Sequence, residues 1–211
     1  MRSIAVKVIV FASTKGGTGK STLCFNAGMH AAREHQVLFA DLDPQGSLTE
    51  LWQRRAELLN PQIVKHVNGV ASAVRRLEDT GYSRDYLFID TPGSHVPIIR
   101  DAVANADVVL VPVQASALDV LGQEAAFDII RGEGKWERAL LLWNRIDARF
   151  KEFNPRIEKI LKEVGLPIVK ITQLVAYAKA GAQAKTGAEI DTKAFGEVAN
   201  VWDAIQEVLK R

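Results

Sequence analysis

A short glycine-rich stretch, Ser13-Thr-Lys-Gly-Gly-Thr-Gly-Lys-Ser-Thr22, carries the most specific chemistry in the chain. Its glycines allow backbone N–H groups to curl around a polyphosphate without interference from Cβ atoms. Lys20 is placed to reach the outer phosphates of a nucleotide, and the Ser21 hydroxyl is a ligand for Mg²⁺. The stretch therefore predicts a phosphate-binding loop, with nucleotide contacts from Gly16, Gly17, Thr18, Gly19, Lys20, Ser21 and Thr22.

The loop departs from the common pattern G-x-x-x-x-G-K-[ST] at one position, and it carries an additional lysine. Thr14 stands where a strict match has glycine, and an additional lysine, Lys15, lies five residues before Lys20. The alternative reading is a turn with a solvated lysine. The flanking sequence favours the phosphate loop, because an apolar, β-branched strand at residues 6–12 precedes it and a helix that would pack on a sheet follows it.

Carboxylates follow two further predicted strands. Asp41 and Asp43 come directly after the strand at residues 37–40, where Asp43 would orient or polarise the attacking water and contribute to the metal site, and Asp41 would support the Mg²⁺ shell. The alternative is an Asx turn, since Asp-Pro is a common turn pair. The apolar run at residues 86–89 ends in Asp90, which is the Walker B pattern for a carboxylate that holds Mg²⁺.

One more strand end is a candidate contact for the base or ribose of a nucleotide. The polar pair Asn144-Arg145 follows the predicted strand at residues 139–143, and Asn144 would meet a base or ribose edge; a simple strand-end turn is the alternative. In the strand predicted at residues 106–113, Pro112 is expected to mark where ladder pairing stops. Residues 114–119 are expected to form a loop, and 120–130 a helix.

The elements that would position these residues alternate between strands and helices along the chain. Further helices are predicted at residues 48–59, 67–77, 96–104, 154–164 and 174–184, and a strand at 167–171. The pattern predicts an α/β fold with a doubly wound, mainly parallel sheet and helices on both faces, in one domain over residues 1–211. The apolar stripe from Phe195 to Leu209 is expected to bury on the sheet; a membrane-targeting tail is the alternative.

Composition sets few limits on the partners. The chain has 211 residues, 47% of them hydrophobic, and a formal net charge of +2, so a polyanionic partner would require a local basic patch. One cysteine, Cys24, allows no disulfide within the chain, which suits a reducing cytosol. The sequence shows no signal-peptide pattern and no apolar run long enough to span a membrane, so a cytoplasmic location without stable membrane insertion is expected.

The motifs together resemble the ParA/MinD family of deviant Walker A ATPases. K-G-G-T-G-K-S-T, D-L-D-P-Q-G-S-L-T, F-I-D-T-P-G-S and A-D-V-V-L-V-P-V-x-x-S-x-L-D carry this resemblance, which extends over essentially the whole chain and is strongest to small, stand-alone plasmid-partition ParA proteins. It implies that ATP and Mg²⁺ are the cofactors and that Lys15, Lys20 and Asp43 form the catalytic set. Ser21, Asp43 and Asp90 would serve the metal, and Lys15 and Asn144 would contact the nucleotide.

The same resemblance implies a slow, partner-stimulated ATPase that works as a homodimer. Lys15 would be the signature lysine that reaches the ATP of the second subunit, so ATP would hold the dimer and hydrolysis would release it. The dimer would bind nonspecific DNA, associate with the nucleoid and position a cargo through a ParB-like or other adaptor protein. Candidate DNA contacts are Lys151, Arg156, Lys170, Lys179, Lys185 and Lys193.

Three alternatives of other classes stay open. A MinD-like regulator would act at a membrane surface, and its C-terminal helix would be an anchor. A metabolic ATP-dependent ligase of the same superfold would need a pocket for a small carboxylate or amine. A reductase of the nitrogenase iron-protein type would need bridging cysteines, which Cys24 alone does not supply.

Overall fold

Within the part of the chain that the structure describes, seven parallel strands form one sheet. The computed structural model describes residues 6–55, 60–64, 69–79, 84–114, 116–147, 149–150, 154–183 and 185–211. The strands are β1 (Lys7–Phe11), β2 (Val37–Asp41), β3 (Gln62–Val64), β4 (Tyr86–Asp90), β5 (Val108–Gln114), β6 (Ala139–Ile146) and β7 (Ile168–Thr172). Their order across the sheet is β3-β2-β4-β1-β5-β6-β7.

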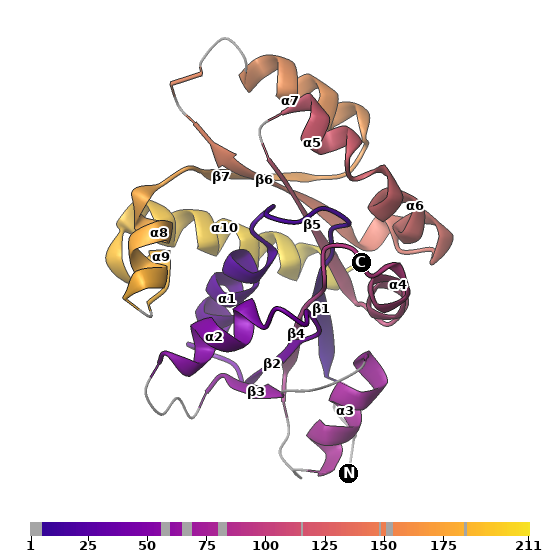
Figure 1. Cartoon of the computed structure of the whole chain (residues 1–211), viewed down its shortest axis with the longest axis vertical. Helices are drawn as coiled ribbons and strands as arrows, with labels where there is room; N and C mark the ends of the chain where they lie inside the picture. The colour runs from indigo at the N-terminus through magenta and orange to yellow at the C-terminus, as the bar shows by residue number, and fades with distance from the viewer. Residues whose placement is uncertain are drawn as a thin grey trace.

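Helices connect these strands and cover the sheet (Figure 1). They are α1 (Lys20–Ala31), α2 (Ser47–Gln53), α3 (Val70–Asp79), α4 (Val96–Ala104), α5 (Ala117–Leu121), α6 (Glu124–Gly132), the 3₁₀ turn η1 (Trp136–Arg138), α7 (Asn154–Glu163), α8 (Val175–Ala182), α9 (Gly187–Ile190) and α10 (Thr192–Leu209). The predicted fold class, a doubly wound parallel sheet with helices on both faces, is confirmed.

Each face of the sheet has its own hydrophobic core. Val8 and Val10 of β1 belong to the core under α3, α4, α6 and α7, whereas Ile9 and Phe11 belong to the core under α1, α2 and α10. This alternation follows from the two-residue period of a strand, and it explains why β1 is apolar throughout. Burial on both faces fixes the position of β1, and therefore of the loop that follows it.

The direction of winding reverses at β1. The chain leaves β1 for β2 and β3, returns to place β4 directly beside β1, and then places β5 on its other side. In open α/β sheets, ligands bind beyond the carboxyl ends of the strands at such a reversal. The loops after β1, β2, β4 and β5 all open at this edge, which is where the sequence motifs lie.

Helix α1 approaches the sheet closely through Gly28. A Cβ added there would lie 2.2 Å from Cε1 of Phe39 in β2, a distance that real contacts do not allow. Glycine at this position therefore lets α1 lie directly on β2. The close packing fixes the N-terminus of α1 at the carboxyl edge of the sheet.

The expectation that pairing stops at Pro112 is wrong. Pro112 pairs with Leu142, and β5 continues to Gln114. The reason is that β5 pairs with β1 only over Val108–Leu110. Beyond that point β5 has a strand on one side only, so the missing N–H of proline interrupts no ladder on the side of β1.

Several boundaries also differ from the prediction. Asn144 and Arg145 lie inside β6, where Asn144 is in register with Gln114, and not in a turn after the strand. The segment expected to be a loop and one helix contains two helices, α5 and α6, because Ser116 caps a short helix and Gly122 ends it. The structure also contains α9, a short helix that the prediction lacks.

The C-terminal helix packs on the sheet as expected. Val198, Val201, Ile205 and Val208 of α10 are buried, whereas Phe195 remains 38% exposed. The predicted helix at 48–59 corresponds to α2, and residues 56–59 lie outside the described part. The helix predicted at 67–77 corresponds to α3, and residues 67 and 68 also lie outside the described part. Among the described helices, none has the length and apolar character needed to cross a membrane.

Candidate functional site

The glycine-rich motif forms the loop between β1 and α1. Gly19 has a φ of 95° immediately before α1, and an added Cβ there would lie 2.5 Å from Nδ2 of Asn144. Glycine is therefore required at this position for both backbone conformation and space. No side chain of the described residues caps the N-terminus of α1, so its first N–H groups are available to an anion.

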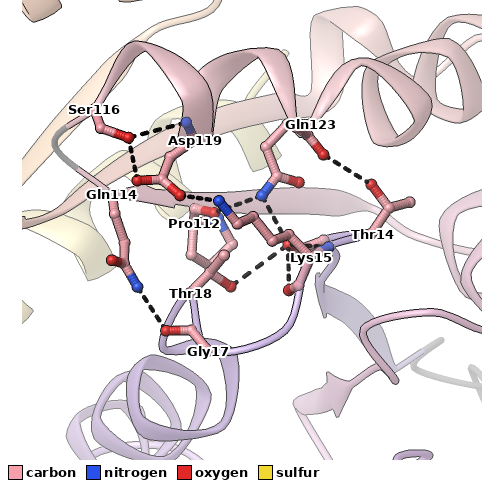
Figure 2. Close-up of polar contacts among 11 residues, drawn as sticks. Thr14, Lys15, Gly17, Thr18, Pro112, Gln114, Ser116, Asp119 and Gln123 are labelled. Atoms are coloured by element: carbon pink, nitrogen blue, oxygen red, sulfur yellow. Dashed lines mark hydrogen bonds and ion pairs between the residues drawn. The ribbon is translucent and has the colours of Figure 1, made fainter.

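Two amide side chains from β5 and β6 hold this loop from outside. Gln114 donates from Nε2 to the carbonyl oxygen of Gly17 at 2.6 Å (Figure 2), and Asn144 donates from Nδ2 to that of Thr18 at 2.8 Å. A trans peptide points its carbonyl and its N–H in opposite directions. Anchoring these carbonyls outward therefore turns the following N–H groups away from the two amides, toward the space where a phosphate would lie.

A set of polar residues on one side of the loop, which we name the α5 flank, consists of Lys15, Ser116, Asp119 and Gln123. Lys15 donates from Nζ to Asp119, and the Ser116 hydroxyl donates to the other oxygen of the same carboxylate (Figure 2). Gln123 donates from Nε2 to Oγ of Ser13 at 2.9 Å. Lys15 thus reaches a helix of its own chain.

The ion pair of the α5 flank is partly accessible to solvent. The side chain of Lys15 is 42% exposed and that of Asp119 is 14% exposed. Burial alone would raise the pKa of Asp119, but hydrogen bonds from Lys15 and Ser116, together with the charge of Lys15, hold it below its ordinary value. Asp119 is therefore ionised at neutral pH and pairs with Lys15 in the single chain.

The residues on the other side of the loop, which we name the acidic flank, are Lys20, Asp41, Asp43 and Asp90. Lys20 is only 6% exposed, and its Nζ donates to the carbonyl oxygen of Lys15 at 3.3 Å. Burial lowers the pKa of Lys20, and the charges of Asp90 and Asp43 oppose this shift. A buried lysine with few partners gains most from a phosphate.

Asp41 and Asp43 organise the turn after β2. Asp41 accepts hydrogen bonds from the backbone N–H groups of Thr49, at 2.8 Å, and of Asp43, at 3.1 Å. Asp43 accepts one from the N–H of Gln45 at 3.0 Å. The Asx turn weighed as an alternative is therefore present, and it fixes Asp43 at the mouth of the site.

Asp90 is the most unusual residue of the acidic flank. It is fully buried, it lies in register with Asp41 of the neighbouring strand, and neither of its carboxylate oxygens accepts a hydrogen bond of ordinary geometry from a described residue. Burial raises the pKa of Asp90 to about 7; the nearby Ser21 hydroxyl and the charge of Lys20 oppose the rise, and the charges of Asp41 and Asp43 add to it. A buried carboxylate without partners calls for a cation.

These oxygen donors fit Mg²⁺. The orphaned carboxylate of Asp90 lies near the Ser21 hydroxyl, with Asp41 and Asp43 on the adjoining strand and turn. Within the described residues no three His, Cys, Asp or Glu side chains converge as a metal cage. Mg²⁺ commonly binds through one or two carboxylates, waters and substrate phosphates, so a closed cage is not needed.

A cavity of about 620 Å³ adjoins the loop on the side of β6 and β7. Its lining combines the start of α1 with the ends of these two strands and α8: Gly19, Thr22, Leu23, Asn144, Arg145, Asp147, Arg149, Thr172, Gln173, Leu174, Val175, Tyr177 and Ala178. Arg145 adopts a positive φ of 57° at its rim. The volume suits a nucleoside adjoining phosphates held in the loop.

The structure brings most of the predicted site residues to one edge of the sheet. The loop and the start of α1 contain residues 16–22, and around them lie Asp43, Asp90 and Asn144. The side chain of Lys15 is paired with α5 instead. Asn144 uses Nδ2 to hold Thr18 and Oδ1 to accept from the N–H of Arg145 at 2.9 Å, so its contact with a base stays a prediction. The prediction missed Gln114, Gln123 and Thr172. Gln114 is the last residue of β5 and Thr172 is the last residue of β7, and this position at the end of a strand was the only sequence signal for these two residues.

Comparison with known proteins agrees with this geometry. A family model described as the CobQ/CobB/MinD/ParA nucleotide binding domain matches residues 9–186. The chain is 34% identical over 140 residues to the chromosome-partitioning ATPase Soj of Thermus thermophilus, a match that covers 52% of this chain and 55% of Soj. It is 32% identical over 115 residues to protein ParA of Rhizobium radiobacter, covering 53% and 50%. The matches thus span about half the length of these two relatives.

Solved structures share the fold at low identity. A proposed plasmid partition protein of Borrelia burgdorferi bound to AMPPNP superposes with a TM-score of 0.75 at 17% identity, over 96% of this chain and 98% of that one. MinD in a MinC:MinD complex of Aquifex aeolicus gives a TM-score of 0.75 at 19% identity, over 94% and 96%. Identities this low establish the fold alone.

The fold and the site therefore define the class of protein, which is a nucleotide-binding α/β protein with a phosphate loop. The family model covers far more than half of the chain, and the chain belongs to the CobQ/CobB/MinD/ParA nucleotide binding domain family. The predicted resemblance to ParA and MinD is confirmed.

Proposed function

We propose that this chain is a ParA-type ATPase over its whole length, which dimerises on ATP, binds nonspecific DNA and positions a cargo with a partner protein that stimulates hydrolysis. The observation that carries the proposal is the difference in environment between the two lysines of one loop. Lys20 is buried beside an orphaned carboxylate, whereas Lys15 is half-exposed and paired with Asp119 of α5.

The nucleotide would lie across the loop and the cavity beside it. Backbone N–H groups of residues 16–22 would bind the phosphates, Lys20 would neutralise the outer ones, and the base would enter the cavity beyond Gly19. Ser21 and Asp90, with Asp43, would hold Mg²⁺, which supplies charge neutralisation of the phosphates. Asp43 would orient the attacking water.

Lys15 would act on the second copy of the chain. Its ammonium group is accessible and held by a single carboxylate, so a partner's triphosphate offers a denser negative charge than Asp119 does. Exchange of Asp119 for the partner's phosphates would couple ATP binding to dimerisation. Loss of the terminal phosphate on hydrolysis would weaken this contact and release the dimer.

DNA binding would use basic residues outside the nucleotide site. Of the candidates from the sequence, Lys151 lies outside the described residues and Lys170 donates to Glu158 at 2.7 Å. Arg156, Lys179, Lys185 and Lys193 are exposed. A dimer doubles the number of phosphate contacts, which would turn weak binding by one chain into useful binding by two.

An electrophoretic mobility shift on nonspecific DNA, with ATP against ADP, tests this function. We expect retention with ATP only, a steep fall with added salt, and persistent retention by Asp43→Ala because its ATP dimer is not hydrolysed. The same samples are mixed with anionic lipid vesicles. Equal retention with ADP, or ATP-dependent binding to vesicles and not to DNA, would contradict the proposal, and the second outcome would identify a MinD-like protein.

A further inference from the structure

The wall of the cavity beside the phosphate loop is held from behind by one buried carboxylate. Thr172, at the end of β7, and Tyr177, in α8, both line the cavity. Glu197 of α10 lies behind them and is only 8% exposed. The three elements meet beside α1 (Figure 1), so a residue late in the chain reaches a wall that the sequence motifs do not include.

Glu197 accepts three hydrogen bonds from this wall. Its Oε1 accepts from Oγ1 of Thr172 at 2.5 Å and from the N–H of Thr172 at 3.2 Å, and its Oε2 accepts from the Tyr177 hydroxyl at 3.2 Å. A carboxylate has acceptors and no donors, so both hydroxyl hydrogens must point at Glu197. Wherever these two hydroxyl oxygens reach the cavity, they therefore present lone pairs and no hydrogen.

The state of Tyr177 agrees with this arrangement. Burial, and then the charge and the hydrogen bond of Glu197, raise the pKa of Tyr177 above its ordinary value. The hydroxyl therefore keeps its hydrogen at neutral pH. Neither hydroxyl can rotate to offer that hydrogen to a ligand without leaving the buried carboxylate short of a partner, which is costly.

We propose that Glu197 is a specificity-determining residue that fixes the hydrogen-bond polarity of the cavity wall, so that the cavity selects a purine with an amino group at position 6 over one with an oxo group there. An amino group donates to the fixed lone pairs of Thr172 and Tyr177. An oxo group in the same place is an acceptor that faces two other acceptors. It forms no hydrogen bond with them and also loses its hydrogen bonds to water. This inference rests on the proposed nucleotide site.

The test compares ATP with inosine triphosphate, whose base has an oxo group in place of the amino group at position 6 and a hydrogen on the adjacent N1. Dissociation constants are measured by calorimetry for the full chain and its variants, with Mg²⁺ present. We expect the wild type to bind ATP about 10- to 100-fold more tightly than inosine triphosphate, as expected for one unpaired polar group at a buried site. Circular dichroism melting checks that each variant is folded.

Glu197→Gln should reduce this preference to within about threefold, because the amide can donate to Tyr177 and release its hydroxyl hydrogen toward the cavity. Thr172→Val should weaken ATP about tenfold and leave inosine triphosphate nearly unchanged, because it removes an acceptor that only the amino group uses. The matched control is Glu207→Gln, the same change on the exposed face of α10, where Glu207 pairs with Lys210. It should retain the wild-type preference.

Two results would overturn the inference. If Glu197→Gln weakens both nucleotides equally and keeps their ratio, Glu197 only supports the fold. If the folded wild type binds both nucleotides equally, the wall does not read position 6. Failure of the proposed function is distinguishable, since it appears as absence of ATP binding or of ATP-dependent DNA retention in the wild type, whatever the ratio.

Discussion

The two flanks of the phosphate loop differ in how completely the single chain satisfies their polar groups. On the α5 flank, the carboxylate of Asp119 accepts from both Lys15 and Ser116, although the buried Oε1 of Gln123 accepts no hydrogen bond from a described residue. On the acidic flank, Asp90 is fully buried and accepts no hydrogen bond of ordinary geometry from a described residue. One loop therefore separates an ion pair that is closed within the chain from a buried carboxylate that is not.

This difference shows what each flank does when its ligand binds. An incomplete buried network destabilises the free protein and gains from an added cation, so the acidic flank favours binding directly. The closed ion pair between Lys15 and Asp119 must first be opened, so the α5 flank opposes the event that uses Lys15. Nucleotide binding and dimerisation are therefore expected to respond to different substitutions.

The largest effect is expected from Lys20→Ala. The substitution removes the buried ammonium group of the acidic flank, and we expect ATP affinity to fall by about 100-fold or more, because a buried charge contact with phosphate is lost. Calorimetry with Mg²⁺-ATP measures it, with Lys7→Ala on the opposite end of β1 as the control. Affinity within threefold of the wild type would show that the loop does not bind the phosphates.

Asp90→Asn tests the orphaned carboxylate. The change is nearly isosteric and removes the buried charge, so we expect the free energy of unfolding without nucleotide or Mg²⁺ to rise by about 1–3 kcal/mol. At the same time the gain in ATP affinity on adding Mg²⁺ should shrink about 10- to 100-fold. Urea unfolding and calorimetry with and without Mg²⁺ measure the two effects.

The two effects of Asp90→Asn must have opposite signs. A variant that is both less stable and equally responsive to Mg²⁺ would show that Asp90 has a structural role and that the cation binds elsewhere. Asp85→Asn is a suitable control, because Asp85 precedes the same strand, is partly exposed, and accepts a hydrogen bond from the N–H of Gln36 at 2.8 Å.

The acidic flank was predictable from the sequence, and the α5 flank was not. Asp43 and Asp90 follow apolar strands directly, and parallel strands bring such positions to one edge. The pairing of Lys15 with Asp119 depends on α5, a five-residue helix inside a segment expected to be a loop. Short helices carry too few turns for a periodic pattern, and only the Ser116 cap three residues before Asp119 indicated this one.

The residues that form the wall of the cavity could not be predicted from the sequence for a related reason. Thr172, Tyr177 and Glu197 come from three different elements, and none belongs to a motif. Glu197 is a charged residue within the apolar stripe from Phe195 to Leu209, and in the structure it is buried and bonded to the end of β7. Periodicity along one helix identifies the apolar face but does not show which charged residue meets a partner from another element.

Lys15→Ala is expected to separate binding from dimerisation. The side chain is half-exposed and points to α5, so we expect ATP affinity of the single chain to change by less than about threefold. ATP-dependent dimerisation should be lost, because the partner's phosphates lose their additional cation. Light scattering with ATP against ADP measures the mass. Dimerisation equal to that of the wild type would show that the second subunit does not use Lys15.

Asp119→Asn should have the smallest effect, and in the opposite direction. Release of Lys15 from its carboxylate removes the contact that competes with a second subunit. Because the pair is partly exposed and screened by solvent, its contribution is small, and we expect ATP-dependent dimerisation at about two- to fivefold lower protein concentration. Stability should fall only slightly for the same reason.

The matched control for this last variant is Asp128→Asn, the same change at an exposed residue of α6 that pairs with Arg131. It should leave dimerisation unchanged in concentration series followed by light scattering. If Asp119→Asn instead weakens dimerisation as strongly as Lys15→Ala does, Asp119 is itself part of the contact between subunits. The closed α5 flank would then be a preformed half of the interface, and opening it would not be a step in dimerisation.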